Sequence, residues 1–145
     1  MSEAATVKRL DRAGLEAIFE RSTFIRAMRL EVLAMDYDKE ELSVRMPIRP
    51  EIERGAPGSR QFHGGAIAAL IDVVGDFAIG MMVGGGVPTM NLRIDYLRPG
   101  LGDWLDATAV VRKTGRTAAV VDIDVFSADR KLVAVGRGTY VPVTG

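Results

Sequence analysis

The chain has 145 residues, the length of one domain and enough to bury a hydrophobic core without disulfide or metal crosslinks. Nineteen basic residues balance nineteen acidic ones, so the net charge gives no reason to expect nucleic acid or a membrane surface as a partner. The absence of cysteine excludes a thiol nucleophile, disulfides and cysteine-bound metal centres, and a single histidine argues against a histidine-rich metal site.

The first third of the chain is predicted to form a short helix and two strands. Residues 1–5 include an acidic residue and no basic region ahead of an apolar run, so no secretory signal is expected and the expected location is the cytoplasm. Asp11 is a candidate N-cap for an amphipathic helix over residues 11–21. Residues 28–35 and 41–48 have the patterns of two strands.

The middle of the chain combines a loop with a strongly apolar helix. Residues 50–62 are rich in glycine, proline and charged residues, which favours an irregular surface loop of a length that often serves a site. Residues 64–83 are apolar nearly all round, which is typical of a helix surrounded by protein. Asp72 and Asp76 interrupt this run near its middle, where charge is costly in a bilayer, so a buried helix is favoured over a membrane span.

The last third of the chain is predicted to consist of strands. The three glycines at residues 84–86 end the helix, because consecutive glycines do not sustain one. Four strand-like segments follow, at residues 89–97, 104–113, 116–127 and 132–141. No linker or internal repeat divides the chain, so we expect one α+β domain over residues 1–145, with an antiparallel sheet curled around a central helix.

Two motifs in this framework resemble those of a known family. His63-Gly64-Gly65, followed by an apolar run to Asp72, resembles the signature of hotdog-fold thioesterases of the phenylacetate-pathway type. Residues 89–99, which end in Leu-Arg-Pro, resemble the next strand of that family, and the likeness spans roughly residues 28–141. It implies a hotdog fold and hydrolysis of acyl-CoA without metal or cofactor, coenzyme A being part of the substrate.

Asp72 is the candidate catalytic residue. An Asp inside an otherwise apolar helix must be desolvated, and a carboxylate in such surroundings tends to have a raised pKa, as a general base needs. From the residues alone, a structural hydrogen bond to a neighbouring backbone or hydroxyl group is an equal alternative. The resemblance implies catalysis, in which this carboxylate activates a water molecule or attacks the thioester directly; both mechanisms stay open.

The other catalytic candidates lie at the helix start and on the following strand. Gly64 and Gly65 open the helix, whose terminal N–H groups suit a developing oxyanion, and the resemblance implies that the Gly64 N–H is the donor. Simple packing of the helix start is the alternative. His63 either orients the thioester or is a structural histidine, and no second histidine is present to complete a triad. Thr89 occupies the family's hydroxyl position, although threonine is also an ordinary strand residue.

Helix geometry predicts a site shared between two chains. Gly64 and Asp72 are eight residues apart on one helix, which separates them by roughly 12 Å at about 1.5 Å per residue. One carbonyl therefore reaches both groups only if they come from different subunits, as in a two-fold dimer with antiparallel central helices and two sites. The family resemblance favours further pairing of such dimers into a homotetramer.

Two departures from the family pattern affect the expected contacts. Many relatives have an asparagine about six positions before the histidine, where this chain has Pro57, so Gln61 is the nearest amide. Asp76 lies one turn after Asp72, where it either tunes the ionisation of Asp72 or is a salt-bridged or interfacial residue. Gly65, Gln61 and Asp76 are therefore candidate substrate-binding residues.

Coenzyme A carries phosphates, which cationic side chains bind, and guanidinium groups do so bidentately. Arg112, Lys113 and Arg116 resemble a basic turn that contacts the nucleotide in relatives, and Arg60 and Arg98 are weaker candidates. For each of them an ordinary solvated surface charge is the alternative.

Two other functions compete with hydrolysis. A hotdog domain without turnover would bind acyl-CoA only, since fold does not determine function. The missing asparagine favours this alternative and Asp72 argues against it. A hotdog hydratase or dehydratase ranks last, because the motif that pairs a histidine with an acid in those enzymes is absent.

Overall fold

The structure is a computed structural model in which residues 8–144 are described. The expectation about a secretory signal concerns residues 1–5, which lie outside this range. The elements in chain order are α1 (Arg12–Arg21), α2 (Thr23–Met28), β1 (Glu31–Asp36), β2 (Glu41–Pro47), the 3₁₀ helix η1 (Pro50–Ile52), α3 (Gly64–Val83), β3 (Thr89–Tyr96), β4 (Trp104–Thr114), β5 (Ala119–Ser127) and β6 (Leu132–Tyr140).

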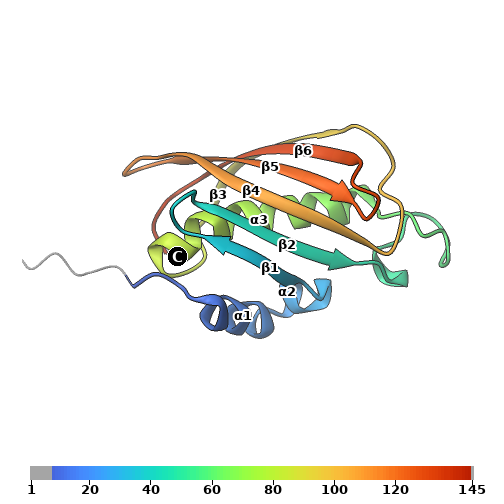
Figure 1. Ribbon diagram of the computed structural model, residues 1–145, viewed down its shortest axis with the longest axis horizontal. Coiled ribbons are helices and arrows are strands. Elements are labelled where there is room, and N and C mark those ends of the chain that lie inside the picture. The colour runs from blue at the N-terminus through green and yellow to red at the C-terminus, as the bar shows by residue number, and fades with distance from the viewer. Residues whose placement is uncertain (1–7, 145) are drawn as a thin grey trace, which may run out of the picture.

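The six strands form one antiparallel sheet that curls around α3 (Figure 1). Their order across the sheet is β1-β2-β4-β5-β6-β3, so β1 and β3 are the two edges. The long helix packs against β2, β3, β4, β5 and β6, and α1 packs against β1. The predicted α+β architecture with a central helix and a short N-terminal helix is confirmed.

The core lies between α3 and the concave face of the sheet. Alternate residues of β2 are fully buried there, and so are Leu70, Ile71 and Val74 of α3. The helix α3 is long and apolar enough to cross a membrane, but 61% of its most apolar window is buried within the protein. The sheet around it accounts for its apolar character, as predicted from the pattern.

The structure corrects the start of two predicted strands. Residues 23–28 form α2, so β1 begins at Glu31 and not at residue 28. Ser22 ends α1 and caps α2, and Arg29 ends α2 in the left-handed region at a φ of 54°. Similarly, β5 begins at Ala119 and not at residue 116, because residues 115–118 form the turn from β4.

The loop before α3 is anchored at its base. It contains η1 and two isolated bridges, Glu53 with Phe62 and Gln61 with Leu101. The Phe62 N–H also donates to the Gly100 carbonyl at 2.8 Å. These contacts hold the residues just before α3 against the segment between β3 and β4.

Candidate active site

His63 caps the start of α3. Its Nδ1 accepts a hydrogen bond from the Gly65 N–H at 2.8 Å, and its own N–H donates to the Ile52 carbonyl at 2.8 Å. Among the described residues the Gly64 N–H has no acceptor, as is usual for the first residue of a helix. The first turn therefore presents one free N–H at Gly64, while that of Gly65 is occupied by the cap.

Tyr96 fixes the helix start from the other side. Its hydroxyl donates to the Gly64 carbonyl at 2.8 Å, and its ring lies about 3.5 Å from where a Cβ on Gly64 would stand. Gly64, Tyr96, Gln61 and Arg98 line one hollow with a volume of about 410 Å³. Tyr96 belongs to the second motif, yet nothing in the sequence pattern had assigned it a function.

A hydrogen bond between Asp72 and Thr89 joins α3 to β3. The Thr89 hydroxyl donates to Oδ1 of Asp72 at 2.8 Å. Asp72 is half-buried in the middle of α3, and Thr89 is the exposed first residue of β3. The structure thus brings together the two residues that the motifs had singled out from separate segments.

Asp76, one turn further along α3, anchors the connection to β3. Its Oδ1 accepts a hydrogen bond from the Val87 N–H at 2.7 Å. Burial raises the pKa of Asp76 to about 7, the hydrogen bond from Val87 opposes this rise, and the negative charge of Asp72 adds to it. Among the described residues Asp76 has no ion-pair partner, so the salt bridge considered from the sequence is not formed within the protomer.

Tyr140 supports the same part of α3 from within the core. It is fully buried, and its hydroxyl donates to the backbone carbonyl of Asp72 at 3.2 Å. Gly75 and Gly138 form the slot for its ring, since a Cβ at either position would overlap it. Burial, and then the charges of Asp72 and Asp76, raise the pKa of Tyr140 well above its usual range, so it stays a donor. The sequence pattern marked Tyr140 only as a strand residue.

The candidate residues fall into two groups along α3. His63, Gly64, Gly65 and the nearby Gln61 lie at its start, whereas Asp72, Asp76 and Thr89 lie around its middle. The helix is unbroken from Gly64 to Val83, so roughly 12 Å of axial rise separates Gly64 from Asp72 at about 1.5 Å per residue. A single protomer does not bring the two groups to one carbonyl.

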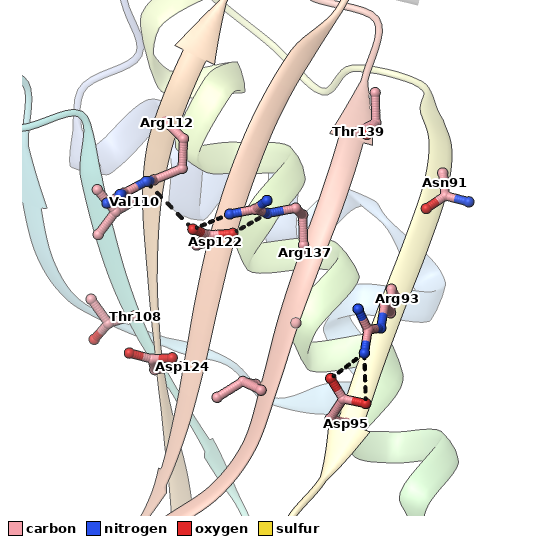
Figure 2. A pocket seen from close by; sticks show the side chains of 12 residues that line it. Asn91, Arg93, Asp95, Thr108, Val110, Arg112, Asp122, Asp124, Arg137 and Thr139 are labelled. Atoms are coloured by element: carbon pink, nitrogen blue, oxygen red, sulfur yellow. Dashed lines mark hydrogen bonds and ion pairs between the residues drawn. The ribbon is translucent and has the colours of Figure 1, made fainter.

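The predicted basic turn lies away from the start of α3 in the same protomer. Arg112 is on the outer face of the sheet, where it pairs with Asp122 at 3.4 Å, and Asp122 also accepts from Arg137 at 2.6 and 2.9 Å (Figure 2). The hydrogen bond from Arg137 holds the pKa of Asp122 below its usual range, although partial burial opposes it. Lys113 and Arg116 are exposed near the β4–β5 turn.

Other cations lie closer to Gly64. Arg54 and Arg98 line the hollow that contains Gly64. Arg60, Arg98 and Lys131 line a neighbouring hollow with a volume of about 700 Å³. Within one protomer, the residues that were weaker candidates for phosphate binding are therefore nearer the helix start than the basic turn.

Comparisons with known proteins identify the family of the chain. Residues 62–134 match the family described as the Thioesterase superfamily. The chain is 31% identical over 123 residues to the acyl-coenzyme A thioesterase PaaI of Escherichia coli, covering 84% of each chain. It is 27% identical over 137 residues to the medium/long-chain acyl-CoA thioesterase YigI of Escherichia coli, covering 81% of this chain and 84% of YigI.

Solved structures show the same fold. The PaaI protein of the Escherichia coli phenylacetic acid degradation operon superposes with a TM-score of 0.78 at 29% identity, covering 92% of this chain and 93% of PaaI. A thioesterase of Haemophilus influenzae gives a TM-score of 0.81 at 23% identity, covering 93% and 92% of the two chains. The second likeness concerns the fold alone.

Proposed function

The chain belongs to the thioesterase superfamily and is a thioester hydrolase of the hotdog fold, and we propose that it cleaves acyl-CoA to the free acid and coenzyme A with Asp72 as the catalytic carboxylate. Two of its relatives are acyl-CoA thioesterases by name, which supports the substrate class. The observation that carries the assignment of Asp72 is its hydrogen bond from Thr89.

That hydrogen bond orients the carboxylate. Thr89 occupies Oδ1 of Asp72, and no described residue donates to Oδ2, which is left for the reaction. As a general base, Asp72 takes a proton from water while the water oxygen bonds to the thioester carbon, and the departing thiolate then takes up the proton. As a nucleophile, it forms an anhydride that water hydrolyses after coenzyme A has left.

The oxyanion that develops on the carbonyl needs a donor, and Gly64 is the candidate. Its N–H has no acceptor within the described part of the chain, unlike that of Gly65, and it lies at the positive end of the α3 dipole. The lack of a side chain on Gly64 leaves the backbone open to the thioester. Tyr96 and His63 hold this turn in place.

We place the reaction at a homodimer interface, because Gly64 and Asp72 of the same α3 lie too far apart to contact one carbonyl group. The exposed edge strand β3 supports this arrangement: Met90 is 62% exposed and Tyr96 is 52% exposed, and both flank the site. An exposed edge with large apolar side chains is a surface that proteins normally cover. Two antiparallel α3 helices, with β3 edges beside them, would form two identical sites. The pairing of dimers into a tetramer belongs to the same proposal.

Release of free thiol from a panel of acyl-CoAs tests this proposal, with Asp72→Asn as the variant. We expect hydrolysis by the wild type and a loss of about 100-fold or more in kcat for the variant, in line with removal of a general base. Asp124→Asn, an exposed carboxylate on the outer face of the sheet, is the matched control and should keep its activity. Binding of acyl-CoA without thiol release would support the non-catalytic alternative.

A further inference from the structure

A mainly apolar hollow lies beside the start of α3, on the helix face that carries Asp72. Gly65 and Ala69 line it, and their spacing to Asp72 places all three on one face. Its volume is about 400 Å³, within the range of small-molecule sites. Side chains of α2 and β2, among them Phe24 and Met46, form its apolar walls.

Arg49 is the only arginine or lysine among the described residues that line this hollow. Its side chain is 12% exposed, and its Nε is buried without a hydrogen-bond partner among residues 8–144. The Glu51 carboxylate lies 3.9 Å from that nitrogen, which is beyond hydrogen-bond distance, and its side chain is 71% exposed. A largely buried guanidinium with one unpaired donor and only a distant, exposed carboxylate beside it is unfavourable, so an anion held in the hollow next to Arg49 would be stabilised.

We propose that the hollow holds the acyl group of the substrate and that Arg49 binds a carboxylate at the far end of that group. The inference rests on the proposed acyl-CoA thioesterase activity and narrows its substrate class to thioesters of dicarboxylic acids. The apolar walls suit the methylene chain, and the positive charge of Arg49 suits a terminal carboxylate, which a guanidinium binds well.

The phosphates of coenzyme A offer the same chemistry to an arginine, but they fit this place less well. A phosphorylated nucleotide carries several charges, whereas the hollow combines one arginine with an acidic residue and apolar walls. More cations line the hollow formed in part by Arg60, Arg98 and Lys131. If Arg49 binds the terminal carboxylate, its loss slows mainly the hydrolysis of substrates that carry that carboxylate. If Arg49 binds a phosphate of coenzyme A, its loss slows the hydrolysis of every acyl-CoA.

Steady-state hydrolysis of matched substrates tests the inference. The substrates are butyryl-, hexanoyl- and octanoyl-CoA beside succinyl-, adipoyl- and suberoyl-CoA, so each pair differs only in the terminal carboxylate. We expect the wild type to prefer the carboxylated member at the chain length that reaches Arg49. Arg49→Met should lower kcat/KM for that substrate by about 10- to 100-fold, the effect of losing a hydrogen bond to a charged group, and should lower kcat/KM for the matched alkanoyl substrate far less.

Arg26→Met removes one exposed charge from α2 outside the hollow and serves as the control. A wild type without preference at any chain length would overturn the inference, and so would an equal loss for all six substrates with Arg49→Met. Should Arg49→Met fail to fold, Arg49→Lys takes its place in the comparison. The preference of the wild type for the carboxylated substrates tests the inference in either case. Absence of hydrolysis for every acyl-CoA would refute the proposed function itself, whereas hydrolysis without the preference refutes only the assignment of Arg49.

Discussion

The Thr89 hydroxyl donates a hydrogen bond to Oδ1 of Asp72 at 2.8 Å, and this contact joins the first residue of β3 to the middle of the central helix. Because the hydrogen bond fixes Oδ1, the orientation of Oδ2 is fixed as well. The approach of β3 is itself held by Asp76, which binds the Val87 N–H two residues before Thr89. Two successive turns of α3 therefore hold the Asp72 carboxylate and the start of β3 in place.

Substitutions of Thr89 should distinguish the effect of its hydroxyl group on activity from the effect of its side-chain shape. Thr89→Val should lower kcat by about 10- to 100-fold, because a charge-assisted hydrogen bond to the carboxylate is lost. Thr89→Ser keeps the hydroxyl and should retain most of the activity. Thiol release with a saturating acyl-CoA gives the comparison, and equal rates for the Val and Ser variants would show that the hydroxyl is not used.

The slot for Tyr140 makes a prediction about stability. Tyr140→Phe loses the hydrogen bond to the Asp72 carbonyl and should lower the free energy of unfolding by about 1 kcal/mol. Gly75→Ala should cost more, by about 1 to 3 kcal/mol, because its methyl group overlaps the Tyr140 ring in a closely packed core. Urea unfolding of both variants measures these values. A Gly75→Ala protein as stable as the wild type would mean that Tyr140 does not occupy this slot.

The raised pKa of Asp76 predicts that the stability of the protein depends on pH. Its pKa is about 7 in the folded protein, above the value of about 4 expected in the unfolded chain, so the unfolded state releases this proton first. The carboxyl group should therefore lower stability as pH rises from about 4 to about 7, by at most about 4 kcal/mol at 1.36 kcal/mol per pH unit. Asp76→Asn keeps an oxygen acceptor for the Val87 N–H and removes the charge.

Chemical unfolding of the wild type and Asp76→Asn at several pH values checks this. The free energy of unfolding of the variant should rise relative to that of the wild type between pH 4 and pH 7, and the difference should persist above pH 7. Parallel stability curves for the two proteins across this range would contradict the raised pKa of Asp76.

Local pattern was sufficient to predict the central helix and most of the sheet. The apolar run over residues 64–83 and the glycines that flank it define α3 within the sequence itself. Alternation along β2 likewise identified its buried face. The short helix α2 was missed, because six residues carry too little periodicity and its start depends on Ser22, which serves both helices.

The candidate site was predictable only where a motif marked it. Asp72 stood out as a charge in an apolar helix, but its contact with Thr89 depends on how β3 returns along α3. The bond from Tyr140 to Asp72 depends on the packing of β6 against the same helix, which periodicity does not determine. The same holds for Arg112, whose partner Asp122 is set by the register of β4 with β5.

Mixed dimers show whether Asp72 and Gly64 of different chains form one active site. Gly64→Pro removes the proposed oxyanion donor, and the first helical position tolerates proline. The backbone of His63, with φ −63° and ψ 138°, is compatible with a following proline. Gly64→Pro and Asp72→Asn should each be nearly inactive as homodimers.

Co-refolding or co-expression of the two variants in equal amounts gives hybrid dimers, each with one doubly altered site and one intact site. If Asp72 of one chain faces Gly64 of the other, the mixture should recover about a quarter of the wild-type rate, since half of the dimers are hybrids and each has one of two sites restored. A mixture as inactive as its two components would contradict the shared site.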